Sequence, residues 1–145
     1  MKMADVGPLH AVVFRVGGLV CALPAGTVRE ILPASPATRL PGAPEGVEGL
    51  VNVRGRLVTT VDLHRVLGSP VPAERVLLLL DRGGRTAGLL VGEVLDFLEV
   101  PAAAVASRES LAGVDARVVA GVGEWGEHRF VLLDSEALLT PLLGG

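Results

Sequence analysis

The sequence predicts a mainly β fold in which two similar small β units pack face to face, with short helices between strands. Short apolar runs end at glycine or proline about every 8 to 12 residues, a spacing typical of small β-barrels and sandwiches. Hydrophobic residues make up 50% of the 145 residues, enough for a substantial core. Turn signals also repeat: Gly17 and Gly18 are followed about 66 residues later by Gly83 and Gly84. We therefore expect an internal duplication.

The first elements are a predicted hairpin and a predicted helical turn. Residues 12–16 and 19–23 are apolar runs, and the glycine pair between them tolerates the positive φ of a tight turn. Residues 26–32 carry apolar side chains at spacings of three and four, which predicts a short helical turn that ends at a proline. The apolar residues of this turn are Val28, Ile31 and Leu32.

A proline-rich loop and a second strand pair follow. Residues 33–46 contain four prolines, which predicts a stiff and mostly extended loop. Residues 49–54 and 56–61 have the composition of two strands joined by a glycine turn. Asp62 then stands where its side chain can cap a short helix at 63–67.

The pattern starts again after a Ser-Pro-Val-Pro segment at residues 69–72, which is the best boundary between two halves. Residues 76–80 and 86–91 flank the second glycine pair and predict another hairpin. Segment 101–115 is the least regular part of the chain. Because the offset between matching residues grows by about nine beyond residue 93, we place an insertion in this segment.

The last elements repeat the end of the first half. Residues 118–122 and 129–133 predict a strand pair. Asp134 can cap a helix over 135–139, which Pro141 should end.

The predicted organisation is one domain between two short tails. We expect an N-terminal tail at 1–10, a single domain at 11–140 with two β-barrel halves at approximately 11–70 and 71–140, and a C-terminal tail at 141–145.

Composition argues against two classes of partner. The chain has 13 Lys and Arg against 16 Asp and Glu, a net charge of −3, with three Phe, one Trp and no Tyr. It therefore lacks the basic and aromatic surface of a nucleic-acid-binding barrel. The longest strongly apolar run, residues 76–80, is far shorter than the roughly 20 residues of a membrane-spanning helix.

Two features predict the cellular compartment. The single Cys21 is expected to be a buried, inert strand residue, and it cannot form an internal disulfide. The N-terminus has no apolar signal core, so we expect a cytoplasmic protein.

The sequence predicts no catalytic residue, no metal site and no cofactor. His10, His64 and His128 stand at unrelated spacings, and each is expected to be a solvated surface residue. Strands flank both glycine pairs, and no serine lies in a Gly-x-Ser-x-Gly segment. A small ligand-binding or enzymatic β-barrel would need convergent titratable groups, and no such cluster is visible.

Two charged residues stand out from this background. Arg54 ends an apolar strand beside a glycine turn, and Glu30 lies between apolar positions of the predicted helical turn. An ordinary solvated charge is the alternative for each. A carboxylate and an arginine in such settings can pair, and a partly buried pair fixes geometry more than it adds stability. A partner can then bind the fixed guanidinium, whose planar donors suit carboxylates and carbonyls.

Several segments around these residues match a known family in the same order. Residues 47–55 contain Gly-x-x-Asn-x-Arg-Gly, and Val-Asp-Leu follows at 61–63. The other matching segments are residues 13–17, 28–32, 41–44, 88–94 and 132–134. From about residue 12 to 139 the sequence resembles the CheW family of bacterial chemosensory adaptors.

The resemblance implies a fold of two five-stranded SH3-like β-barrels around a shared core, and no enzymatic activity. It also implies two partners, the cytoplasmic tip of chemoreceptors and the regulatory domain of a CheA-type histidine kinase. Neither nucleic acid nor direct membrane insertion is implied, because the receptors themselves hold the assembly at the membrane.

The resemblance further implies which residues bind the partners. Arg54 matches the arginine that the family has at the strand turn, and Val28 and Glu30 match positions near the receptor groove. Three residues are expected only as apolar lining of a groove or interface: Leu50, Val51 and Val91.

The chain departs from the family pattern at three places. Residues 58–60 read Val-Thr-Thr where a proline is usual, Cys21 replaces an aromatic or aliphatic residue, and Gly92 stands where an aspartate is frequent. The missing carboxylate motivates an alternative. The chain can be a divergent CheW-like protein of a gliding or pilus motility pathway that binds receptor but engages the kinase weakly or not at all.

Overall fold

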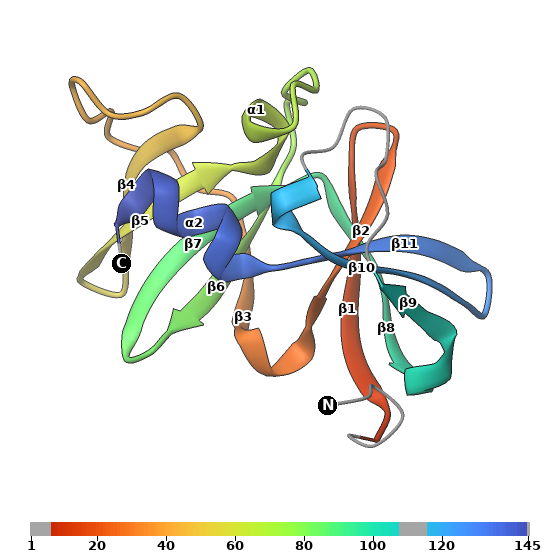
Figure 1. The fold of residues 1–145 in the computed structure, drawn as a ribbon. Helices are drawn as coiled ribbons and strands as arrows, with labels where there is room; N and C mark the ends of the chain where they lie inside the picture. Colours follow the sequence, from red (N-terminus) through yellow and green to blue (C-terminus); the bar gives the residue numbers. More distant parts are fainter. Residues whose placement is uncertain (1–6, 108–115, 145) are drawn as a thin grey trace.

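The strands assemble into two sheets that lie side by side (Figure 1). The structure is a computed structural model that describes residues 7–107 and 116–144. In spatial order, the six-stranded sheet contains β8 (Glu93–Val100), β1 (Leu9–Val16), β2 (Leu19–Pro24), β11 (His128–Leu133), β10 (Val119–Trp125) and β9 (Val105–Ser107). The five-stranded sheet contains β3 (Val28–Pro33), β6 (Val76–Arg82), β7 (Arg85–Val91), β5 (Arg56–Asp62) and β4 (Val47–Val53). The predicted mainly β fold is confirmed.

The helical segments are short. They are α1 (Leu63–Val66), α2 (Ser135–Leu143) and three single 3-10 turns at Ala25–Thr27, Ala102–Ala104 and Ala116–Val118. Asp62 and Asp134 cap the two α-helices as predicted. The Asp62 carboxylate accepts a hydrogen bond from the His64 backbone N–H at 2.9 Å, and the Asp134 carboxylate accepts one from Ala137 at 3.1 Å.

Each sheet combines a hairpin from one half of the chain with strands from the other half. The β1–β2 hairpin joins the four strands β8, β9, β10 and β11, and the β6–β7 hairpin joins the three strands β3, β4 and β5. The expectation that halves 11–70 and 71–140 form separate barrels is therefore wrong. The duplication itself is visible, because the order β8-β1-β2-β11-β10 matches the order β3-β6-β7-β5-β4.

The sixth strand and the chain ends lie where the sequence is least regular. β9 falls inside segment 101–115, where we expected an insertion, and residues 108–115 lie outside the described residues. Of the expected tail at 1–10, residues 1–6 also lie outside them, and β1 already begins at Leu9.

Residues 28–33 form strand β3, so the predicted helical turn over 26–32 is wrong. The pairing of β3 with β6 shifts register between Val28 and Glu30, which indicates a β-bulge. Because of the extra residue, Val28 and Ile31 both pack against the central core, while Leu32 packs on the other side of the strand. The bulge thus produces the three- and four-residue spacings that imitate a helix.

Helix α2 runs two residues beyond Pro141, although the sequence predicted an end at residue 139. A tertiary contact holds this end of the helix. Arg82 at the end of β6 donates a hydrogen bond to the Gly144 carbonyl at 2.9 Å. The helix that follows β11 of one sheet is thereby anchored on the other sheet.

The core has three parts. The central cluster draws buried residues from both sheets and both helices, including Phe14, Leu89 and Leu139. Of the two smaller clusters, one is built from strands of the six-stranded sheet and the other from strands of the five-stranded sheet. Cys21 is buried in the central cluster, as predicted, and burial raises the pKa of its thiol to about 12.

Candidate protein-binding groove

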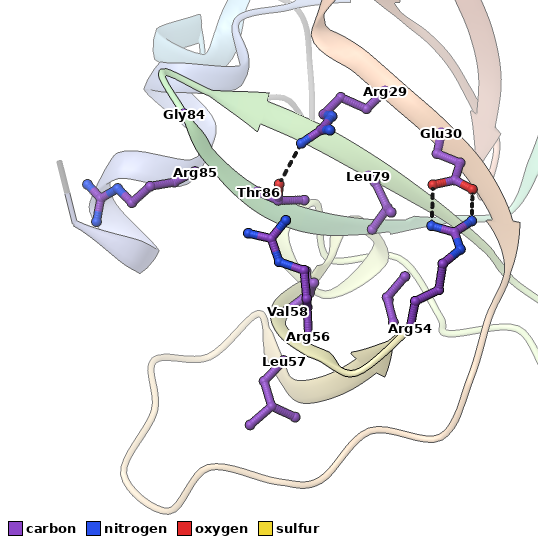
Figure 2. Close-up of a pocket in the computed structure, with 11 residues that line it drawn as sticks. Arg29, Glu30, Arg54, Arg56, Leu57, Val58, Leu79, Gly84, Arg85 and Thr86 are labelled. Atoms are coloured by element: carbon purple, nitrogen blue, oxygen red, sulfur yellow. Dashed lines mark hydrogen bonds and ion pairs between the residues drawn. The ribbon is translucent and has the colours of Figure 1, made fainter.

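A groove of about 410 Å³ opens beside the two edge strands of the five-stranded sheet, β3 and β4. Figure 2 shows the side chains that line it. Strand β3 supplies Arg29 and Glu30, and the β4–β5 hairpin supplies residues 53, 54 and 56–58. The rest of the lining comes from the β6–β7 hairpin: Leu79, Gly84, Arg85 and Thr86.

Arg54 stands in an unfavourable backbone conformation at one end of this groove. The two-residue turn between β4 and β5 has φ of 50° at Arg54 and 83° at Gly55, the combination of a type I′ turn. Asn52 supports the turn by accepting a hydrogen bond from the Gly55 backbone N–H at 2.7 Å. Within residues 7–107 and 116–144, Arg54 is the only residue other than glycine with positive φ. A residue other than glycine in the left-handed conformation costs about 1 kcal/mol or more. The turn alone therefore does not favour arginine, and the contacts of its side chain must explain its presence.

Glu30 and Arg54 form a two-point ion pair across the groove (Figure 2). The Arg54 Nη1 lies 3.0 Å from Glu30 Oε2, and Nη2 contacts Oε1. The Arg54 and Glu30 side chains are 66% and 34% exposed. Because β3 and β4 are opposite edges of the same sheet, the pair closes the open seam between them. The hypothesis that these two residues pair is confirmed.

The β3 bulge explains why Glu30 can reach Arg54 while its neighbours point elsewhere. Val28 packs against the central core on the other side of the strand. Arg29 is exposed and donates a hydrogen bond from Nη1 to the Thr86 hydroxyl at 3.2 Å, which holds its guanidinium over the groove. Of these three consecutive residues, Val28 therefore packs in the core, Arg29 lies at the rim of the groove, and Glu30 forms the ion pair.

The ion pair shifts the pKa of both groups. The hydrogen bonds from Arg54 hold the pKa of Glu30 below its ordinary value of 4.5, although partial desolvation opposes the shift. The charges of Arg54 and Arg29 act in the same direction as the hydrogen bonds. The hydrogen bond to Glu30 in turn raises the pKa of Arg54. Both groups are therefore charged throughout the neutral range.

A carboxyl titration followed by NMR tests this pair. Since the folded pKa of Glu30 is lowered, the pair stabilises the fold above about pH 4.5, the ordinary pKa, and this stability is lost as the pH falls through the folded pKa. We expect the Glu30 midpoint below 4.5 in the wild type and a higher midpoint in the Arg54→Ala variant. An identical midpoint in both proteins would contradict the contact.

A family model matches nearly the whole chain. The model of the CheW-like domain matches residues 10–142. The chain belongs to the CheW-like domain family. It is 40% identical over 91 residues to Protein PilI of Pseudomonas aeruginosa, a match that covers 61% of this chain and 51% of PilI. The chain thus matches about half the length of that relative.

Two further matches cover more of the CheW-like domain. The Chemotaxis protein CheW of Klebsiella aerogenes is 28% identical over 132 residues, covering 88% of this chain and 80% of that protein. The crystal structure of the scaffolding protein TtCheW from Thermoanaerobacter tengcongensis superposes with a TM-score of 0.80 at 22% identity, covering 88% and 89% of the two chains. The predicted fold of two SH3-like subdomains is confirmed.

Of the site residues expected in the CheW-like domain, the structure brings two together in the groove, Glu30 and Arg54. Leu50 is half-buried, and its backbone pairs with Thr38 of the proline-rich loop through two hydrogen bonds of 2.8 Å. Val51 and Val91 are fully buried in two different parts of the core. The expectation that Val51 and Val91 line a groove or interface is therefore wrong, because neither side chain reaches the surface.

Sequence reasoning missed most of the groove. Arg29, Arg56 and Arg85 are exposed lining residues, and Leu57 beside them is 68% exposed. One signal was available: Arg56 and Leu57 follow the Arg54 turn directly. The positions of Arg29 and Arg85 beside them depend on pairing between strands that are far apart in the sequence.

His64 is the clearest departure from the expected histidines. It is fully buried rather than solvated, and its Nδ1 lies 2.9 Å from a carboxylate oxygen of Asp62. The second Asp62 oxygen accepts a hydrogen bond from Arg75 at 2.7 Å. This cluster joins the end of β5 to the start of β6, away from the groove. Among the described residues, no group of three or more His, Cys, Asp or Glu could hold a metal ion.

The packing of the backbone around residue 92 explains why a glycine stands there. A Cβ at this position would lie 2.7 Å from the Arg15 backbone carbonyl, and the Gly92 N–H donates to that same carbonyl at 2.8 Å. The turn from β7 to β8 therefore approaches β1 too closely for any side chain. An aspartate here would require the backbone to move.

None of the helices that the structure describes has the length and apolar character of a membrane-spanning segment.

Proposed function

We propose that this CheW-like domain is a non-enzymatic adaptor in the cytoplasm. It couples the cytoplasmic tips of chemoreceptors to the regulatory domain of a CheA-type histidine kinase. The match of the CheW-like domain model to residues 10–142 is the observation that supports this most strongly. Its partners are proteins, and it associates with the membrane only through them.

The ion pair at the groove gives the proposal a physical basis. The Arg54 guanidinium is held at the surface by Glu30 and a strained turn, so little side-chain entropy is lost when a partner binds it. Its donors that face away from Glu30 remain suited to a carboxylate or a backbone carbonyl. We assign partner binding to Arg54 and Glu30, with Leu50 and Val28 supporting the two edge strands that carry them.

The alternative is a divergent adaptor of a gliding or pilus motility pathway that binds receptor but engages the kinase weakly or not at all. Two observations support this alternative. The first is the 40% identity over 91 residues to Protein PilI, a relative whose name differs from that of the chemotaxis protein CheW. The second is Gly92, where the packing against Arg15 leaves no room for the carboxylate frequent in the family.

Calorimetric titration separates these functions. The purified chain is titrated with a receptor-tip fragment and, separately, with the kinase regulatory domain. Saturable binding to both is the expected result for the adaptor. Binding to the receptor tip alone would favour the alternative, and binding to neither would contradict both.

A further inference from the structure

The groove carries a charge opposite to that of the whole chain. Among its eleven lining residues are four arginines and one glutamate, a formal charge of +3, on a chain whose net charge is −3. The arginines are Arg29, Arg54, Arg56 and Arg85. A local concentration of one charge attracts partners of the other charge and raises their association rate.

The glutamate neutralises only one of these arginines. Glu30 uses both carboxylate oxygens on Arg54, so it does not form an ion pair with Arg29 or Arg56. Figure 2 shows the guanidinium groups of Arg29 and Arg56 on either side of Thr86. Both side chains are exposed. An incoming carboxylate can therefore approach these two arginines from solvent.

The floor of the groove is apolar. Val58 and Leu79 are each 5% exposed beneath the arginines, and Leu57 adds an exposed aliphatic side chain at the rim. An apolar floor under a charged rim is the arrangement of protein-binding surfaces, where an anchoring side chain is desolvated and charges surround it.

From these observations we propose that the groove binds an acidic segment of a partner protein. Carboxylates of this segment pair with Arg29 and Arg56, and one of its apolar side chains covers Val58 and Leu79. The inference rests on the proposed adaptor function and specifies the chemistry of the segment that docks. A nucleic acid fits the groove less well, because none of the lining residues is aromatic and none can stack on a base.

Charge reversal at Arg56 tests the proposal. The Arg56→Glu variant is titrated with the receptor-tip fragment and with the kinase regulatory domain, beside a matched Arg129→Glu control. Arg129 is 86% exposed on β11 of the other sheet, and its substitution changes the net charge equally. Because Arg56 is exposed and outside the ion pair, thermal unfolding should be unchanged in its variant.

We expect Arg56→Glu to weaken binding to one of the two partners about tenfold at low salt, because it places like charges together. Arg129→Glu should change the affinity less than about twofold. Wild-type binding to that partner should also weaken as salt rises from about 50 mM to about 500 mM, since salt screens exposed charges. The Arg56→Glu variant should show a smaller salt dependence.

The outcomes separate this inference from the proposed function. If the wild type binds a partner but Arg56→Glu and Arg129→Glu behave alike, the acidic segment is excluded and the adaptor function stands. If the wild type binds neither partner, the adaptor function itself fails. A single-stranded RNA oligonucleotide is the third probe. RNA binding that is lost in Arg56→Glu would overturn the proposal in favour of a nucleic-acid surface.

Discussion

Replacing Asp62 with alanine should lower the free energy of unfolding by about 3–5 kcal/mol, the range for removing one partner of a buried ion pair. The Asp62 carboxylate is fully buried and contacts Arg75 at 2.7 Å, the His64 ring at 2.9 Å and the His64 backbone N–H at 2.9 Å. The alanine variant therefore loses the cap of α1. It also leaves the guanidinium of the mostly buried Arg75 without its main partner.

Asp134 provides a matched control for this prediction. It occupies the same position in the second half of the chain and caps α2, but its carboxylate accepts an exposed hydrogen bond from the Ala137 backbone N–H. Asp134→Ala should lower the free energy of unfolding by only about 1 kcal/mol, the usual effect of losing a helix cap. Urea unfolding of both variants measures the difference. Equal losses would mean that the buried contacts of Asp62 add nothing beyond capping.

Replacing Arg54 with asparagine should separate stability from binding. Asparagine is favoured at the left-handed first position of a type I′ turn, so the turn itself should be at least as stable as in the wild type. Partner affinity should fall about 30-fold or more, the effect of removing a hot-spot residue, because the guanidinium and its two-point contact with Glu30 are both lost. Urea unfolding and calorimetric titration provide the two measurements.

Glu30→Gln distinguishes the two roles of the ion pair. This variant keeps Arg54 but removes the negative charge that positions its guanidinium. If the pair only connects β3 to β4, Glu30→Gln and Arg54→Asn should both lower the free energy of unfolding. Neither should then change the affinity of the folded protein for its partner. If Arg54 contacts the partner, Arg54→Asn should weaken binding more than Glu30→Gln does. A double-mutant cycle measures how strongly the two residues are coupled.

Local signals predicted much of the fold because their causes are local. The Gly17-Gly18 turn joins β1 to β2, and the Gly83-Gly84 turn joins β6 to β7, as expected for residues that tolerate positive φ. The two aspartate caps also depend only on residues two or three positions away. The sequence indicates the Glu30–Arg54 pair only through two charges in apolar surroundings, and the structure confirms it.

The remaining features escaped the sequence because distant segments cause them. The spacing of Val28, Ile31 and Leu32 imitates a helix, and only pairing with β6 reveals the bulge that produces it. The chain around His64 does not predict its burial, because α1 packs against β7, a strand that is distant in the sequence. Three of the groove arginines come from three different strands, and no local pattern connects them.

The amino-acid sequence by itself determined that the chain forms short β-strands in two repeated halves, with turns and caps at defined positions. Those features follow from hydrophobic patterning and turn chemistry within a few residues. Only the tertiary structure decided that the β1–β2 and β6–β7 hairpins each join strands of the other half. It also decided that β3 and β4 become sheet edges, which Glu30 and Arg54 connect. The reason is physical: both halves offer strands of similar pattern, and burial of one shared core selects which of them pair.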